Sequence, residues 1–294
     1  MSKKRLGLIV SILALLGLIA LIPIKFHQPD PTYEGIHLSE WLVESAKANF
    51  STKEDAQIHQ RKASLAIKHS GTNAVPTLLR MIRAREHPVL NTLYLLISKL
   101  PFGRIDHVSP SSLQIVGMKG FQELGPAASN AVLELIDIVD HSPSSMSKQA
   151  AIASLKSIGS SANESAPSLL RATESTNQYV RAHALAALYP VHVAPELAVP
   201  KLINALDDPT QGGRTAAAIG LAQYGTNAQS AVPALVVAYN KAKDSARSSG
   251  ETVGPGMLFQ YALRQIDKDS AAQLREESAK ANPAADTLRL ENPE

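Results

Sequence analysis

One short motif recurs along the chain at a fixed interval. The motif is a proline, any residue, a leucine and a further aliphatic residue, and it places Pro167, Pro200 and Pro233 at equal intervals. A copy without the proline places Leu133 almost the same interval before Pro167, and an earlier copy at Pro76 lies further upstream than one interval. A fixed period of about 33 residues is typical of stacked structural units, because each unit presents a similar surface to the next.

A second pattern precedes each copy of the motif. In five segments, alanines or larger apolar residues recur at i, i+3, i+4 and i+7, which places them on one face of a helix. Four segments end in Gly71, Gly125, Gly159 or Gly225, where a helix C-terminus favours a positive φ, and the fifth ends at Pro190. Each motif then starts another helix, because proline is tolerated in a first turn. The segments are 61–71, 113–125, 149–159, 180–190 and 214–225.

Each unit is therefore predicted to contain a first helix, a tight turn and a second helix. Neither helix can cover its own apolar face, so the units are expected to stack and to bury those faces between neighbours. Aromatic residues make up only 4% of the chain, which favours close packing of helices over a β-sandwich. The predicted fold class is all-α, a superhelix of helix pairs.

The units resemble HEAT repeats, in the variant also found in phycobilisome lyases. The segment VRAHALAAL at 180–188 resembles the first helix of that family, and A-V-P-x-L resembles its second helix. The resemblance covers residues 53 to about 267 and implies a HEAT/armadillo-type solenoid. It is specific for the fold and carries no assigned activity.

The resemblance also implies a ladder of side chains between units. In the family, an Asp before the first helix pairs with an Arg within it. Arg181 and Arg214 match the Arg, and Asp208 resembles the Asp. Because Asn177 and Lys148 replace these residues elsewhere, the ladder is expected to be incomplete.

A further implication is that the second helices line the inner curve of the solenoid. The residues four positions after the motif position would then face a partner. Their chemistry is mixed, which suits an extended polypeptide better than a single cofactor. These residues are Arg80, Asp137, Arg171, Asn204 and Val237.

The first residues of the chain predict a membrane anchor. Leu6 to Ile24 contain 19 positions without a charge, and a helix of that length spans roughly 28 Å, close to the hydrocarbon thickness of a bilayer. Lys3, Lys4 and Arg5 precede the segment and are expected to stay on the cytoplasmic side. The alternative is a cleaved signal peptide, but no A-x-A pattern follows the apolar run. We therefore expect a single-pass protein with its N-terminus in the cytoplasm and its solenoid on the exported side.

The opening YEGIHLSEWL at 33–42 also resembles bacterial single-pass membrane proteins with an exported HEAT array. Within that likeness, Leu38 to Phe50 is a short capping helix. The predicted organisation is a cytoplasmic basic start at 1–5, a transmembrane anchor at 6–26, a linker at 27–37, a solenoid at 38–281 with an inserted helix and loop near 88–112, and a tail at 282–294.

The sequence lacks the residue patterns of catalytic and metal sites. It contains no cysteine, and no two histidines have the H-x-x-x-H spacing of a helical metal chelate. The segment SMSK at 145–148 fits S-x-x-K, but the companions S-D-N and K-T-G of that catalytic pattern are missing. No catalytic, cofactor-binding or metal-binding residue is predicted, and the chain is not expected to be an enzyme.

One basic cluster stands out in the charge pattern. Residues 60–119 carry nine basic and two acidic side chains, a balance of +7. The cluster is either a solvated face or a docking surface for an acidic protein or anionic lipid head groups. The candidate binding residues are Arg80, Arg83, Arg85, Lys99 and Arg104.

The net charge gives no reason to expect nucleic acid as a partner. Outside Lys3, Lys4 and Arg5, the basic residues (29 − 3 = 26) equal the 26 acidic residues in number. The predicted function is a membrane-anchored scaffold for a protein partner. The alternatives are a lyase- or isomerase-like enzyme that uses the solenoid groove, and a structural element of the envelope or lipid surface.

Overall fold

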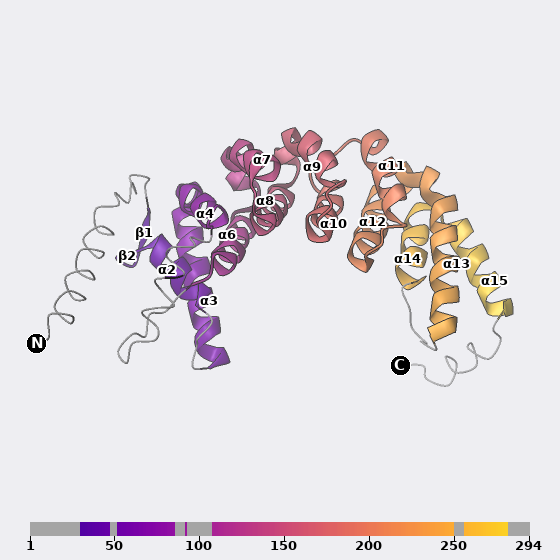
Figure 1. Cartoon of the computed structure of the whole chain (residues 1–294), viewed down its shortest axis with the longest axis horizontal. Coiled ribbons are helices and arrows are strands. Elements are labelled where there is room, and N and C mark those ends of the chain that lie inside the picture. The colour runs from indigo at the N-terminus through magenta and orange to yellow at the C-terminus, as the bar shows by residue number, and fades with distance from the viewer. Residues whose placement is uncertain (1–29, 48–51, 86–91, 93–107, 250–255, 282–294) are drawn as a thin grey trace, which may run out of the picture.

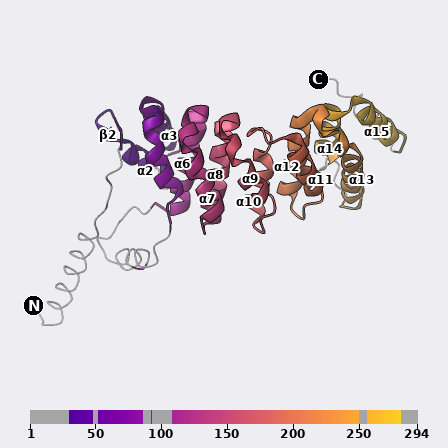
Figure 2. The ribbon, with the colours of Figure 1, turned by 90° about the horizontal axis from the view of Figure 1, so that it is seen from above.

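The structure is a computed structural model that describes residues 30–47, 52–85, 92, 108–249 and 256–281. These residues form an arch of helix pairs that follow one another in a single row (Figures 1 and 2). The first helices are α3 (Lys53–Ser70), α6 (Pro110–Leu124), α8 (Ser145–Ile158), α10 (Gln178–Ala187), α12 (Gln211–Tyr224) and α14 (Gly256–Ile266). The second helices are α4 (Val75–Ile82), α7 (Val132–His141), α9 (Ala166–Ala172), α11 (Pro195–Ala205), α13 (Val232–Ser249) and α15 (Lys268–Ala281).

The predicted helix pairs and the mostly helical solenoid are confirmed. The predicted capping helix is α2 (Leu38–Ala46). The predicted linker contains a feature that the sequence did not indicate, a short antiparallel hairpin of β1 (Thr32–Tyr33) and β2 (Ile36–His37).

The predicted anchor at 6–26, most of the inserted segment near 88–112 and the tail at 282–294 lie outside the described residues. Within the described residues, no helix has both the length and the apolar character needed to cross a membrane.

The predicted glycine turns are confirmed. Gly71, Gly125, Gly159 and Gly225 each follow a first helix with φ between 53° and 72°. A short 3-10 helix then leads to the second helix in each of these units: η1 (Gly71–Ala74), η2 (Gly125–Ala131), η3 (Gly159–Ser165) and η4 (Gly225–Ala231). In the unit of α10 and α11, the residue with positive φ is His192, at φ 61°. It stands one full repeat after Gly159 and one full repeat before Gly225. Pro190 therefore lies inside this turn and does not replace the glycine.

Replacing Gly159 by alanine is expected to destabilise the protein by about 1–3 kcal/mol through backbone strain. Gly159 has φ 72° and ψ −140°, a conformation that residues with a Cβ rarely adopt. The nearest atom to a new Cβ is Pro190 O at 3.6 Å, so crowding would not explain a loss. Urea denaturation followed by circular dichroism measures the effect. A Gly159→Ala protein as stable as the wild type would contradict the assignment of strain.

One motif proline is placed differently from the prediction. Pro76, Pro167 and Pro233 lie in the first turn of their helices, whereas Pro200 lies inside α11. The reason is local, because Pro195 already opens α11 one turn earlier.

The leucine of the motif explains how successive units pack. Leu78, Leu135, Leu169, Leu202 and Leu235 are all fully buried. Leu78 and Leu202 lie against glycines of the next first helix: an added Cβ would be 2.3 Å from Leu78 at Gly120 and 2.8 Å from Leu202 at Gly220. The equivalent residues in α8, α10 and α14 are also small and fully buried, namely Ser154, Ala187 and Ala262. We call this set of small residues the notch column.

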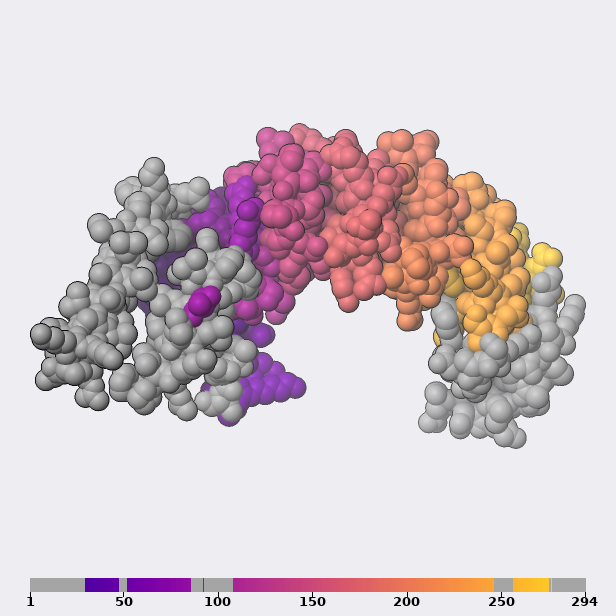
Figure 3. All heavy atoms as spheres, viewed as in Figure 1, coloured from indigo at the N-terminus to yellow at the C-terminus, as the bar shows by residue number. Residues whose placement is uncertain are grey.

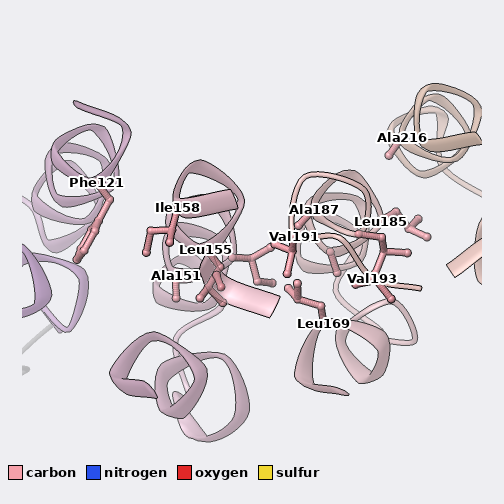
Figure 4. Packing of buried hydrophobic residues seen from close by; sticks show 14 of the residues in the cluster. Phe121, Ala151, Leu155, Ile158, Leu169, Leu185, Ala187, Val191, Val193 and Ala216 are labelled. Atoms are coloured by element: carbon pink, nitrogen blue, oxygen red, sulfur yellow. The ribbon is translucent and has the colours of Figure 1, made fainter. Parts of the chain in front are cut away.

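The buried side chains form one cluster that runs along the array. Figure 4 shows part of it between α6 and α12, including Leu155 of α8, Leu169 of α9 and Val193, which follows α10. This continuity is the expected result of units that cover one another's apolar faces.

The expectation that the second helices line the inner curve is wrong. The first helices α6, α8, α10 and α12 lie along the inner side of the arch, and α7, α9 and α11 lie along its outer side (Figure 1). Neighbouring first helices also contact one another far more extensively than neighbouring second helices do. The physical reason is side-chain size, because small buried residues such as Ala151, Ala184 and Ala217 let the first helices approach closely and shorten that side.

Candidate functional site

Carboxylates from outside the predicted basic cluster neutralise part of it. Arg80 Nη2 lies 3.7 Å from Asp30 Oδ1. Arg83 Nη1 donates to Glu134 Oε2 at 2.6 Å, and its Nη2 lies 4.0 Å from Asp137 Oδ2. The charge balance read from the sequence alone therefore overstates the positive charge on this face.

The three candidate residues that the structure describes do not share one carboxylate partner. Arg80 and Arg83 contact different carboxylates, and Arg85 is exposed just after α4. Lys99 and Arg104 lie outside the described residues. A docking role for these five residues stays a prediction.

The ladder is present where the sequence matches the pattern. Arg181 Nε donates to Asp208 Oδ2 at 2.5 Å, and Arg181 Nη2 donates to Asp208 Oδ1 at 3.1 Å. Arg214 Nη1 donates to the Asp208 backbone oxygen at 2.7 Å. Asp208 thus joins α10 to α12. The hydrogen bonds from Arg181 are the main reason that the pKa of Asp208 falls to about 2.

The ladder is incomplete where the sequence departs from the pattern, as predicted. Asn177 caps α10 and accepts hydrogen bonds from the backbone nitrogens of Tyr179 and Val180. Lys148 Nζ donates to the backbone oxygen of Asp140 at 3.2 Å. Neither residue forms a carboxylate pair between units in the part of the chain that the structure describes.

The S-x-x-K segment also has a structural role. Ser144 caps α8, with its hydroxyl accepting a hydrogen bond from Ser147 N at 3.2 Å. Lys148 donates to Asp140, as described above, rather than to Ser145. The described residues contain no group of three or more His, Asp or Glu side chains placed to hold a metal ion.

The inner side of the arch presents a different kind of surface. On α12, Ile219 is 40% exposed, whereas Ala217 and Leu221 on the opposite side of the helix are fully buried. Ile219 therefore points away from the second helices and into the hollow of the arch, which Figure 3 shows as an open space. Tyr179 on α10 is 59% exposed, and Tyr261 on α14 is 50% exposed.

We call the solvent-facing residues of α8, α10, α12 and α14 the inner face. They are mainly apolar or uncharged polar residues, with basic residues toward one edge. The inner face includes Met146, Gln149, Lys156, Tyr179, Ala182, Thr215, Ile219, Met257, Tyr261 and Arg264.

The four helices α8, α10, α12 and α14 contain no acidic residue. The helix α6, which also lies along the inner side, contains Glu123, whose carboxylate pairs with Lys68 at 3.0 Å. The basic residues of the four helices fall into two groups. Lys148, Arg181 and Arg214 are engaged between units, whereas Lys156 and Arg264 are exposed and form no ion pair with another described residue. The inner face therefore combines exposed apolar side chains with two exposed basic side chains, Lys156 and Arg264.

A second concave region lies on the outer side. It is a groove of about 680 Å³ between α11 and α13, with Leu206, Pro233 and Val237 among its lining residues. Lys241 Nζ and Asp207 Oδ1 form an exposed ion pair at its edge, 2.5 Å apart. Its lining residues come from α11 and the segment that follows it, and from α12, α13 and α14, so the groove is more local than the inner face, which extends from α8 to α14.

The sequence prediction missed the apolar residues of the inner face. It looked for partner-binding residues on the second helices, where Asn204 and Val237 are exposed on the outer side. A signal was present, because Tyr179 and Ile219 fall outside the buried phase of their helices. Apolar residues that gather on the polar phase of several neighbouring helices are the pattern that marks an interaction surface.

Comparison with known proteins supports the repeat. A family model described as HEAT repeats matches residues 168–252, from α9 to just beyond α13. No curated protein is significantly similar to the chain in sequence.

Three solved structures of engineered proteins are similar. A designed armadillo repeat protein in complex with the peptide (KR)4 has a TM-score of 0.41 at 17% identity, covering 78% of this chain and 99% of that chain. Computationally designed armadillo repeat proteins for modular peptide recognition have a TM-score of 0.41 at 18% identity, covering 78% of this chain and 100% of that chain. A further engineered protein has a TM-score of 0.38 at 17% identity, covering 80% of this chain and 96% of that chain. The HEAT-type repeat of α9 to α13 follows from the sequence match, and the helical solenoid follows from the structure itself.

Proposed function

We propose that this protein is a membrane-anchored scaffold that holds a protein partner on the exported side of the membrane. The inner face supports this proposal, because it exposes apolar side chains on several consecutive units. An exposed apolar surface of this kind marks an interaction site. A surface that extends over several units also suits a polypeptide better than a small molecule.

The proposed anchor would hold the solenoid close to the bilayer. Asp30 is fixed to the first units, with Asp30 Oδ2 accepting from Ser39 Oγ at 2.5 Å and Asp30 Oδ1 accepting from Thr77 Oγ1 at 3.0 Å. Only four residues of chain lead from the end of the 6–26 segment to Asp30, and they span at most roughly 15 Å. A partner on the arch would therefore be kept near the membrane surface.

A membrane-impermeant lysine cross-linker, applied to intact cells that make the full chain, tests the proposal. The expected result is one reproducible cross-linked partner in amounts comparable to the protein itself. A permeant reagent of the same reach is the control. Cross-linking by the permeant reagent alone would contradict the exported location. The lack of a reproducible partner with either reagent would contradict the scaffold function.

A further inference from the structure

We propose that the inner face binds an extended, acidic polypeptide segment with an apolar side chain at about every third residue. The inference rests on the proposed scaffold function and adds the chemistry of the partner. It follows from three properties of the inner face: its lack of acidic residues, its exposed apolar side chains and the spacing of its helices.

The spacing of the helices sets the spacing of the partner's side chains. Ile219 and Tyr261 occupy equivalent positions on the neighbouring helices α12 and α14, and Met146 and Tyr179 occupy equivalent positions on the neighbouring helices α8 and α10. Packed helix axes are about 8–10 Å apart, and an extended chain advances about 3.3 Å per residue. A chain that crosses the helices would therefore present roughly every third residue to the next unit.

Uncharged polar groups lie between these apolar residues. Gln149 on α8 and Thr215 on α12 are partly exposed on the same face. Amide and hydroxyl groups both donate and accept hydrogen bonds, so they are suited to an extended backbone, which carries both kinds of group. Small residues such as Ala182 leave room for that backbone to approach.

The charges on the inner face determine the sign of the partner's charge. Lys156 on α8 and Arg264 on α14 are exposed, and no acidic side chain of the four helices opposes them. A basic partner would meet like charges, whereas carboxylates would find two cations at the edge of the apolar strip. An acidic segment is therefore the chemistry that this surface favours.

The first experiment compares three fluorescein-labelled peptides by anisotropy with the full-length chain in detergent. One peptide has four Leu-Glu-Ser repeats, the second has four Leu-Lys-Ser repeats, and the third has the composition of the first with its leucines contiguous. The Leu-Glu-Ser peptide is expected to bind at least about tenfold more tightly than either of the others. Equal binding of the acidic and basic peptides would overturn the proposed charge preference. If the contiguous-leucine peptide binds as tightly as the Leu-Glu-Ser peptide, the proposed spacing of one apolar side chain at about every third residue would be overturned.

The second experiment places a charge on the inner face itself. Tyr179→Glu and Ile219→Glu are each expected to weaken binding of the Leu-Glu-Ser peptide by about tenfold or more, because a carboxylate would then face the peptide's own. Val237→Glu is the matched control, since Val237 is 65% exposed on the outer side. Circular dichroism checks that each variant is folded. Loss of binding in Val237→Glu alone would place the site on the outer groove and overturn the proposal.

A failure of the inner-face proposal can be distinguished from a failure of the proposed scaffold function. If the cross-linked partner of the cellular experiment is captured equally by wild-type and Tyr179→Glu protein, the scaffold function stands and the inner-face proposal is wrong. If the partner is lost only in Tyr179→Glu, both are supported.

Discussion

Replacing Leu202 by alanine is expected to lower the free energy of unfolding by about 2–5 kcal/mol. The side chain is fully buried, and it fills the space between α11 and the notch-column residue Gly220 of α12. Its removal takes away buried apolar contacts and leaves a cavity between two units. Urea denaturation followed by circular dichroism measures the change.

A second variant, at the glycine against which Leu202 packs, tests the same contact more specifically. Gly220→Ala alone is expected to cost about 1–3 kcal/mol, because its new Cβ would lie 2.8 Å from Leu202 Cδ2. In the Leu202→Ala background the same methyl group would enter the cavity, so the double variant is expected to be more stable than the sum of the single effects predicts. Gly212→Ala is the control, because its Cβ would meet only Ala182 Cβ at 3.9 Å. Additive effects of Leu202→Ala and Gly220→Ala would contradict the packing of the motif leucine into the notch.

Loss of the Asp208 carboxylate is expected to have an effect of similar size. Asp208→Ala should lower the free energy of unfolding by about 3–5 kcal/mol, because it leaves the largely buried guanidinium of Arg181 without its partner. The side chains of Asp208 and Arg181 are only 4% and 16% exposed. Asp207→Asn is the control: this neighbour pairs with Lys241 at the surface, where the side chains are 80% and 69% exposed, and little change is expected.

Asp208 also predicts a pH dependence. Its pKa is lowered to about 2 in the folded protein from an ordinary value of 3.8. The carboxylate therefore contributes its full stabilisation above about pH 4, and this contribution is lost as the pH falls from there through about 2. Asp208→Asn should remove this part of the acid dependence, whereas Asp207→Asn should leave it. Identical acid unfolding of Asp208→Asn and wild-type protein would contradict the assignment.

Much of the fold could be predicted because it depends on residues close together in the sequence. The glycines at 71, 125, 159 and 225 end helices through their own backbone freedom, and the motif prolines start helices for a similarly local reason. The ladder between Arg181 and Asp208 could be predicted from a resemblance that covers both residues.

The position of the exposed apolar residues on the inner side of the arch could not be predicted, because it depends on the curvature of the whole array. Which helix layer lies inside is decided by the summed packing of many small residues, among them Ala151 and Ala217. The turn at His192 was missed because a histidine in a positive-φ position carries no signal as strong as glycine. The neutralisation of Arg83 by Glu134 was missed because the two residues are far apart in the sequence.

The notch column gives single residues control over the shape of the arch. Each notch-column residue sets the distance between two neighbouring units. A larger side chain at Gly120 or Gly220 would therefore tilt all the units that follow that junction. Because the tilt acts over the length of all the following units, a small rotation at the junction gives a large displacement at the far end of the arch. One substitution in the notch column would thus widen or narrow the opening of the arch without changing any residue of the inner face.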